Sequence, residues 1–482
     1  MMMKSDSDSF ELMKISFVRF IPKNGFNCSL LLAAFLAGSL HAEDETLVSR
    51  GPDKEWISMP TRTLENLPSI ATNKKLGKYG GRVTSSPKAT GFYHTVRLKD
   101  RWWLVDPEGL PYLHCGVTSI RETRTPKAAA ALVKKFENKK GWAHATGDLL
   151  KEYGFNSIGP WSDHRSLQPA KQELAYTKIW NFMSSYGKER GGTFQKSGHK
   201  GYLGNCPFIF DPEFKVFCEK HAQDNLTKLK DDPWLLGHFT DNELPWHIEM
   251  LDRYLALSKD EPGYQAAAKW IMERKGTSEL PKEWNHEDRL QFVKHAADTY
   301  FSIVCKAIRK VDPNHLILGS RFHGSALKLP TLFEAAGQHL DAISVNYYHR
   351  WTPETERIRQ WSANAGKPIL ITEWYAKGVD SGMGNTSGAG WLVKTQEDRG
   401  RFYQNFTLGL LESEVCIGWH WFRYSDNDPE QKGVDPSNLD SNKGIVTAHY
   451  DPYNPLLERM KAINERTYGL ISHFDKKSQT KE

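Results

Sequence analysis

Residues 234–246, WLLGHFTDNELPW, contain an apolar run that ends abruptly in acidic and amide side chains. The run has the composition of a buried β-strand, and Asp241, Asn242 and Glu243 follow it directly, before Pro245 prevents regular continuation. Polar groups just beyond a buried strand lie at its carboxyl end, where parallel α/β barrels keep their chemistry. On its own the triplet also fits a surface turn, so its interpretation depends on the rest of the chain.

The chain alternates short apolar runs with longer helical patterns. The expected strands are Tyr112–Val117, Phe155–Gly159, Thr177–Asn181, Leu235–Thr240, His315–Gly319, Ala342–Asn346, Pro368–Thr372 and Val415–Trp419. Helical stretches, with apolar residues three and four positions apart, include Lys127–Glu137, Phe214–Leu229, Leu290–Arg309, Glu354–Ala363, Glu397–Leu411 and Pro455–Arg466.

This alternation predicts an α/β fold, a (β/α)8 barrel with long loops at its catalytic face. An open doubly wound sheet is the alternative, but no glycine-rich phosphate loop follows an early strand. Two long connections, residues 182–213 and 244–289, are candidates for the walls of a substrate cleft.

The amino terminus has the features of an export signal. Basic residues such as Lys14 and Arg19 precede the apolar stretch Leu30–Leu40, and Ala42 stands before acidic residues. Residues 1–42 are therefore expected to be a signal peptide that directs the chain to the periplasm or the exterior. An uncleaved membrane anchor is the alternative, although the apolar stretch is short for a bilayer span. After cleavage no membrane association is expected.

Three further segments complete the expected organisation. Residues 43–95 form an N-terminal extension that packs on the barrel, and residues 96–470 form the catalytic domain, which begins with a hairpin turning at Asp106–Gly109. Residues 471–482 form a polar tail.

Composition limits the classes of function. The chain is 39% hydrophobic and 25% charged, which is ordinary for a globular protein. Its net charge of +6 is modest and no run of five basic residues occurs, so no nucleic-acid partner is expected. The small basic excess suits an anionic polysaccharide as well as an ordinary surface. The oligomeric state is left open.

The cysteines indicate neither a disulfide scaffold nor a zinc site. Signal cleavage would leave an odd set without CxxC spacing. One bridge, between Cys206 and Cys218, and free buried thiols both remain open. The set is Cys115, Cys206, Cys218, Cys305 and Cys416.

A second segment, residues 367–377 (KPILITEWYAK), repeats the pattern of the first. Its apolar run ends at Glu373. The runs before Glu243 and Glu373 count as barrel strands four and seven, which lie on opposite sides, so the two carboxyls can face each other across the mouth. Cleavage of a glycosidic bond needs two carboxyls in this arrangement.

An Asn-Glu after strand four and a Glu at the end of strand seven resemble clan A glycoside hydrolases, which are retaining enzymes. The resemblance implies that Glu243 is the acid/base, Asn242 the ligand of the sugar 2-hydroxyl and Glu373 the nucleophile. Longer segments resemble glycoside hydrolase family 50, the β-agarases, over residues from about 95 to 470. These segments are GFNSIGPWSD (154–163), FDPEF (210–214), GHFTDNELPW (237–246), DAISVNYY (341–348), ITEW (371–374) and GWHWFRYSDNDP (418–429).

This resemblance implies a polysaccharide or oligosaccharide substrate, agarose cut at β-1,4 bonds to neoagaro-oligosaccharides, without cofactor or metal. Agarases of that family carry a large N-terminal β-sandwich-like domain before the barrel, which residues 43–95 are too few to form. Another galactan (porphyran or a carrageenan type) or a mannan therefore stays open as the substrate.

Several aromatic and basic residues are further candidates for substrate binding. Tyr347 resembles the clan's aromatic that binds the nucleophile, with Tyr348 as its rival. Trp419 and Trp421 alternate along the last strand, so both can face one sugar. The other candidates are Trp161, Trp374, Arg321 and His323.

Two interpretations from other classes remain. A non-catalytic carbohydrate-binding barrel is one, against which the presence of both glutamates argues. A metal-dependent hydrolase is the other, but no HExxH motif and no cluster of His and Asp falls at the strand ends. His238, within the fourth run, is expected to be a core residue.

Overall fold

The structure is a computed structural model of the chain, and it describes residues 44–84 and 88–479. The expected signal peptide, residues 1–42, lies outside the described residues. Among the residues described, none of the helices combines the length and apolar character that a membrane crossing requires.

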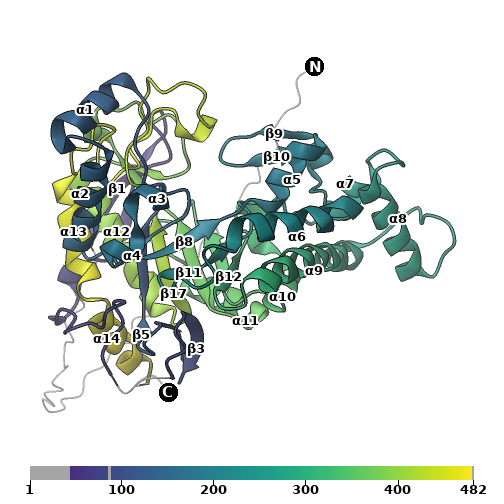
Figure 1. The fold of residues 1–482 in the computed structure, drawn as a ribbon, viewed down its shortest axis with the longest axis horizontal. Coiled ribbons are helices and arrows are strands. Elements are labelled where there is room, and N and C mark those ends of the chain that lie inside the picture. Colours follow the sequence, from purple (N-terminus) through teal and green to yellow (C-terminus); the bar gives the residue numbers. More distant parts are fainter. Residues whose placement is uncertain (1–43, 85–87, 480–482) are drawn as a thin grey trace, which may run out of the picture. The chain divides into compact units, whose positions relative to one another are not determined.

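Eight parallel strands form a barrel, with helices packed around it (Figure 1). Each strand except the fifth and sixth pairs with both of its neighbours along the chain, and the last pairs with the first. A parallel bridge between Phe322 and Val345 closes the remaining gap between the fifth and sixth strands. The (β/α)8 prediction is confirmed. The strands are β6 (His114–Val117), β7 (Ser157–Ile158), β8 (Ala175–Ile179), β11 (Leu235–Phe239), β12 (Leu316–Gly319), β13 (Ile343–Asn346), β14 (Ile369–Glu373) and β17 (Cys416–Trp421).

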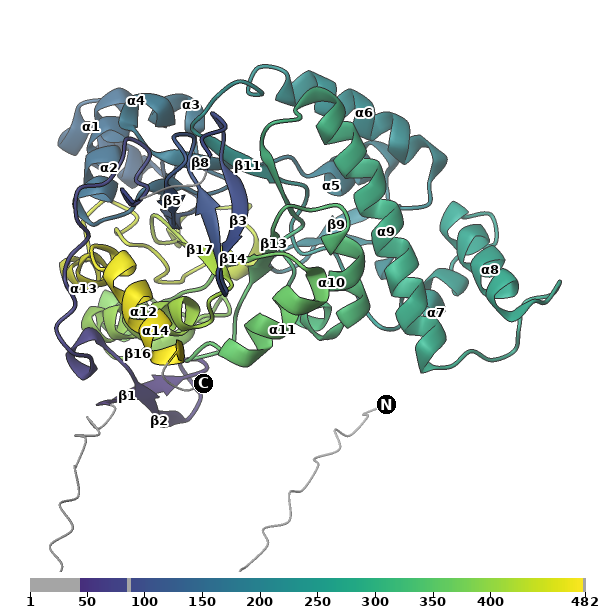
Figure 2. The same ribbon diagram turned by 90° about the horizontal axis from the view of Figure 1, so that it is seen from below.

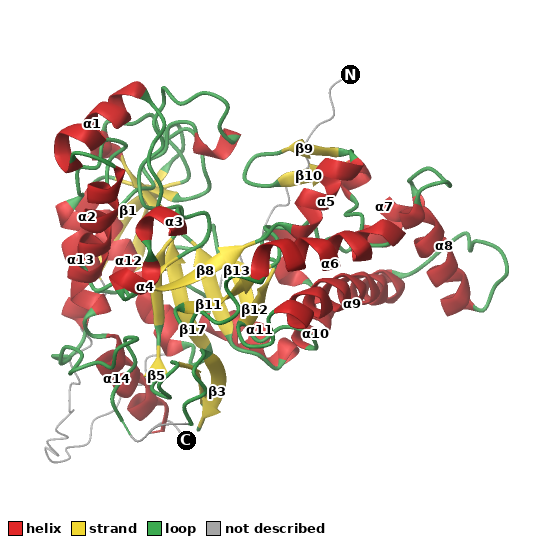
Figure 3. Cartoon of the chain, viewed as in Figure 1, coloured by secondary structure: helices red, strands yellow, loops and turns green. Residues whose placement is uncertain are grey.

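The helices, drawn in red in Figure 3, form from stretches of sequence whose apolar residues lie on one face. The long helix α9 begins with a capping box between Asn285 and Asp288, and its buried residues recur every three or four positions. The main helices are α1 (Pro126–Phe136), α2 (Lys139–Glu152), α3 (His164–Leu167), α4 (Pro169–Gln172), α5 (Phe182–Arg190), α6 (Pro212–Leu226), α7 (Met250–Leu255), α8 (Pro262–Lys275), α9 (His286–Val311), α10 (Pro330–Gly337), α11 (Thr355–Ala365), α12 (Gln396–Glu412), α13 (Asn454–Asn464) and α14 (Thr467–Gln479).

The N-terminal extension contributes strands to a small second sheet. Strands β1 (Asp44–Ser49) and β2 (Trp56–Thr61) form a hairpin, and β1 also pairs with β16 (Trp391–Val393), which pairs with β15 (Ala376–Gly378) (Figure 2). The extension thus adds to the segment that follows barrel strand seven. Next along the chain, β3 (His94–Leu98), β4 (Arg101–Val105) and β5 (Pro111–Tyr112) form the expected hairpin and its third strand.

The polar tail expected from residue 471 onward is instead helical as far as Gln479, as part of α14. Ile471 and Phe474 are buried three positions apart on one face. Asp475 forms an ion pair with Arg101, with 2.6 Å between Oδ1 and Nη2. The buried apolar face and the ion pair with Arg101 together hold the end of α14 against the rest of the domain.

The cysteines among the described residues are all free and buried, so Cys206 and Cys218 form no bridge. Burial raises the pKa of the Cys206 thiol to about 12.

Candidate active site

A cavity of about 560 Å³ lies at the carboxyl ends of the barrel strands. Glu243 and Glu373 both line it, together with Asn242, Trp161 and His323. Five candidate residues identified from the sequence therefore meet in one cavity.

Only one of the two long connections lines this cavity. Residues 195–200, within connection 182–213, lie on its wall. None of the lining residues comes from connection 244–289, and its Trp246 is buried against the rings of Tyr300 and Phe301. The expectation that 244–289 forms a cleft wall is wrong, because its apolar residues pack against α9 instead.

Glu243 is positioned by the turn that follows β11. Asp241 faces inward and accepts hydrogen bonds from the backbone of Met183 (2.9 Å) and from the Tyr300 hydroxyl (2.7 Å). Glu243 has a φ of 50°, in the left-handed region, and its backbone N–H donates to Ser320 O at 3.0 Å. The strained backbone at Glu243 fits a residue that the fold holds in place for a function.

The carboxyl of Glu243 is almost enclosed, with 9% of the residue exposed. Asn346 donates from Nδ2 to its Oε1 at 2.7 Å, and His199 Nδ1 lies 3.8 Å from its Oε2. Burial, and to a lesser degree the charge of Glu373, raise the pKa of Glu243 to about 7, against opposing effects of His323 and Asn346. A carboxyl of this kind carries a proton near neutral pH.

Glu373 lies at the end of β14 in a different environment. Arg321 Nη2 lies 2.7 Å from one carboxylate oxygen, and the Tyr348 hydroxyl donates to the other at 2.7 Å. Arg321 also donates to Thr372 O at 3.0 Å, and its guanidinium lies 4.2 Å from the centre of the Trp161 ring. Both oxygens of Glu373 are therefore fixed, and the charge of Arg321 compensates its own.

The two carboxyls thus differ in the way that acid/base and nucleophilic roles require. One has a raised pKa and is able to donate a proton, whereas the other is ion-paired and oriented toward the same cavity. A protonated carboxyl that shares one cavity with an ion-paired carboxylate is typical of glycoside cleavage.

The side chain of Tyr347, the first choice for an aromatic on the nucleophile, does not reach the Glu373 carboxylate, although the Tyr347 backbone N–H donates to Glu373 O at 2.9 Å. Its hydroxyl donates to Glu354 Oε2 at 2.9 Å, and the neighbouring Tyr348 contacts Glu373 instead. Adjacent residues of an extended chain point to opposite sides, so only one of the two reaches the cavity. Tyr348, the rival in the sequence analysis, has this position.

Three tryptophans expected to bind substrate are buried outside the cavity. Trp419 donates from Nε1 to the Tyr403 hydroxyl at 2.8 Å, and Trp421 donates to Lys443 O at 2.9 Å. Trp374 stacks on a ring of α12 and is 1% exposed. All three pack between the barrel and α12, so their assignment to substrate binding is corrected.

The residues directly after Trp374 and Trp421, which are Tyr375 and Phe422, do line the cavity. The same offset of one residue separates Tyr347 from Tyr348. In each case an aromatic pair sits at a strand end and the second member faces the cavity. The sequence shows each aromatic pair, but which member of the pair faces the cavity depends on where the strand bends.

A hairpin that the sequence analysis did not anticipate closes over Glu243. It consists of β9 (Thr193–Gln195) and β10 (Lys200–Tyr202), with Gly198 at its tip. Gly198 has a φ of +85°, and a Cβ there would lie 3.8 Å from Glu243 Oε2. Asp435, from the loop after β17, accepts from the backbone N–H of Gly198 at 2.9 Å. No local sequence signal links residues this far apart.

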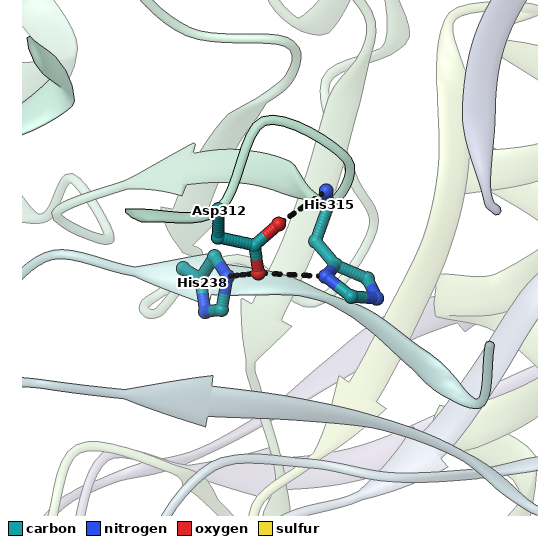
Figure 4. Close-up of side chains that lie close together, drawn as sticks. All are labelled: His238, Asp312 and His315. Atoms are coloured by element: carbon teal, nitrogen blue, oxygen red, sulfur yellow. Dashed lines mark hydrogen bonds and ion pairs between the residues drawn. The ribbon is translucent and has the colours of Figure 1, made fainter. Parts of the chain in front are cut away.

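A cluster of His238, Asp312 and His315 lies near the start of β12 (Figure 4). Asp312 Oδ2 lies 2.9 Å from His238 Nε2 and 2.7 Å from His315 Nδ1. The Trp180 indole N–H, which can only donate, reaches His238 Nδ1 at 3.0 Å. His238 Nε2 therefore carries the hydrogen that binds Asp312, and it has no lone pair for a metal.

This cluster is thus a buried hydrogen-bonded network that ties β11 to the end of α9. Its Asp312 carboxylate has a lowered pKa because the two histidines hydrogen-bond to it and outweigh the effect of burial. None of its members lines the cavity.

The chain is similar in sequence to curated proteins and in fold to solved structures. No family model matches the chain. β-Agarase B of Vibrio sp. (strain JT0107) is 25% identical over 89% of this chain and 53% of its own length, and β-agarase A of the same strain is 25% identical over 83% and 48%. The chain thus spans about half the length of these curated relatives.

Two solved structures share the architecture. One, described as BpGH50, is 30% identical, covers 90% of this chain and 96% of its own, and superposes with a TM-score of 0.78. Another, of an exo-β-agarase, is 22% identical, covers 83% of this chain and 68% of its own, with a TM-score of 0.71, and shows the shared fold.

Proposed function

This chain belongs to glycoside hydrolase family 50, and from that premise we propose that it is a retaining glycoside hydrolase that cleaves β-1,4 bonds in an agarose-type galactan. The observation that carries the proposal is the pair Glu243 and Glu373, which line one cavity in opposite electrostatic environments.

The proposed reaction is a double displacement. Glu243 donates its proton to the glycosidic oxygen while Glu373 attacks the anomeric carbon, which forms a glycosyl ester and releases the leaving sugar. Glu243 then takes a proton from water as the water attacks the same carbon, which restores Glu373 as a carboxylate. Arg321 and Tyr348 orient Glu373 throughout, and Asn242 binds the sugar 2-hydroxyl.

The substrate class is proposed from the relatives. Both curated relatives are named β-agarases, so agarose and its oligosaccharides are the first substrates to test, with neoagaro-oligosaccharides as products. Porphyran, carrageenans and mannan are the comparison substrates.

The test combines product analysis with chemical rescue. The chain is incubated with each polysaccharide, and reducing ends and product sizes are measured. A Glu373→Gly variant should lose activity and regain it with azide, with formation of a glycosyl azide of α configuration, because azide attacks from the face that Glu373 vacates. Glu356→Gly, at an exposed helical glutamate outside the cavity, is the matched control and should need no rescue. Release of no reducing sugar from any substrate would contradict the hydrolase proposal.

We further propose that the chain is exported. The support is the basic segment followed by the apolar stretch Leu30–Leu40 and a small residue at Ala42. Expression of the full chain should give a periplasmic or secreted product whose first residue is Glu43, as read by N-terminal sequencing. A product that stays in the cytoplasm with residues 1–42 attached would contradict export.

A further inference from the structure

One wall of the cavity carries two arginines without a counter-ion. Arg121 follows β6 and Arg423 follows β17, and both line the cavity. Among the described residues neither side chain forms a hydrogen bond or an ion pair, and Arg423 Nε is buried without a partner. A buried donor that lacks a partner costs free energy unless a ligand supplies one.

The two guanidinium groups line the same cavity, and the charge of Arg121 opposes that of Arg423. Burial, and then the charge of Arg121, lower the pKa of Arg423 to about 10, so it remains a cation at neutral pH. The pKa of Arg121 is also lowered, first by burial and then by Arg124. Like charges held together in this way would be stabilised by a bound anion.

Lys443 adds a third basic group beside Arg423. The Arg423 N–H donates to Lys443 O at 3.2 Å, and Lys443 Nζ donates to Ser437 O (2.5 Å) and Asn438 Oδ1 (2.7 Å). Lys443 is 1% exposed, and burial, followed by the charge of Arg423, lowers its pKa well below the usual range. An anion nearby would favour its protonated form.

The carboxylates of the region are engaged elsewhere. Glu373 is paired with Arg321, and Asp435 accepts from the hairpin tip. Asp426, the carboxylate whose charge acts on Arg423, accepts hydrogen bonds from Asn442 Nδ2 (3.0 Å) and the Gly444 N–H (2.8 Å). Asp435 is the remaining lining carboxylate on this wall, so the positive charges of Arg121 and Arg423 still exceed the negative charge beside them.

We propose that Arg121 and Arg423 form a subsite for a sulfate ester on a sugar next to the scissile bond, so that a sulfate at this position strengthens the binding of an agarose-type galactan. A guanidinium presents a planar fork of donors that matches the oxygens of an oxyanion, whereas neutral sugar hydroxyls need no such charge. This assignment rests on the proposed glycoside hydrolase function and names the substrate class of the same cavity.

The first experiment measures selectivity. Values of kcat/KM are determined on sulfated porphyran oligosaccharides and on the same oligosaccharides after removal of the sulfate. The unmodified chain should favour the sulfated form at least tenfold, and Arg121→Gln and Arg423→Gln should each lower that ratio at least tenfold. Arg97→Gln, at an exposed arginine of β3 outside the cavity, should leave the ratio unchanged. Because the readout is a ratio, a general loss of active protein does not move it.

The second experiment separates the subsite from catalysis. Binding of both oligosaccharides to Glu373→Gln is measured by calorimetry at low and high salt. Tighter binding of the sulfated form, weakened by salt and by Arg423→Gln, supports the subsite even if nothing is cleaved, in which case only the hydrolase proposal fails. Cleavage of agarose with equal binding of both forms overturns the subsite and leaves the hydrolase proposal intact.

Discussion

Asn346 Nδ2 donates to Oε1 of Glu243 at 2.7 Å, which links the end of the sixth barrel strand to the turn after the fourth. The Thr372 hydroxyl donates to Asn346 Oδ1 at 2.7 Å, which leaves the amide N–H₂ facing Glu243. The acid/base candidate is therefore oriented by a residue that is itself fixed by the strand carrying Glu373.

This relationship predicts a pH dependence. With a pKa of about 7, Glu243 loses its proton as the pH rises through neutrality, so kcat/KM should fall on the alkaline side from about pH 7. The Asn346 hydrogen bond favours the carboxylate, so Asn346→Ala should raise the pKa of Glu243 and shift that alkaline limb to higher pH. Thr372→Val should shift it in the same direction but less. The measurement is the profile of kcat/KM against pH. A shift of the alkaline limb to lower pH in Asn346→Ala would contradict the assignment of that limb to Glu243.

Two adjacent tyrosines give a matched pair of variants. Tyr348 donates to the Glu373 carboxylate, whereas Tyr347 donates to Glu354 outside the cavity. A hydrogen bond to a charged group contributes about 1.5–3 kcal/mol, so Tyr348→Phe should lower kcat/KM by roughly ten- to a hundredfold. Tyr347→Phe should stay within about twofold of the unmodified chain, since its hydrogen bond is peripheral. Equal losses of kcat/KM in the two variants would show that the hydrogen bond from Tyr348 to Glu373 does not contribute to catalysis.

Trp421 and Phe422 should separate stability from binding. Trp421 is fully buried, so Trp421→Ala should lower the free energy of unfolding by about 3–5 kcal/mol. Phe422 lines the cavity, so Phe422→Ala should raise KM severalfold with a small change in Tm. Thermal unfolding and steady-state kinetics are measured on both. A larger loss of Tm in Phe422→Ala than in Trp421→Ala would contradict the assignment of Trp421 to the core and of Phe422 to the cavity wall.

The barrel could be predicted because its signals are local. Each strand is a short apolar run, and both Glu243 and Glu373 follow such runs directly, so their meeting in one cavity follows from strand count alone. The assignments of Tyr347, Trp374 and Trp421 failed by one position, because the side to which a side chain points depends on how each strand bends at its end. Asp435 could not be found, because its contact with Gly198 joins segments separated by most of the barrel.

That contact gives a last prediction. Asp435 accepts from the Gly198 N–H at 2.9 Å and from Gln195 Nε2 at 2.5 Å, which holds the hairpin tip over Glu243. His199, on the same tip, lies 3.8 Å from Glu243 Oε2.

Asp435→Ala should release the tip and raise KM severalfold, with a smaller effect on kcat, because substrate would then bear the cost of ordering the loop. Glu430→Ala, at an exposed carboxylate of the same loop that pairs with Lys127, is the control and should leave both constants unchanged. Limited proteolysis near residue 198 should speed up only in Asp435→Ala. If KM and cleavage rate match those of the control, the hairpin holds its position without Asp435, and its closure over Glu243 is a property of the β9–β10 pairing alone.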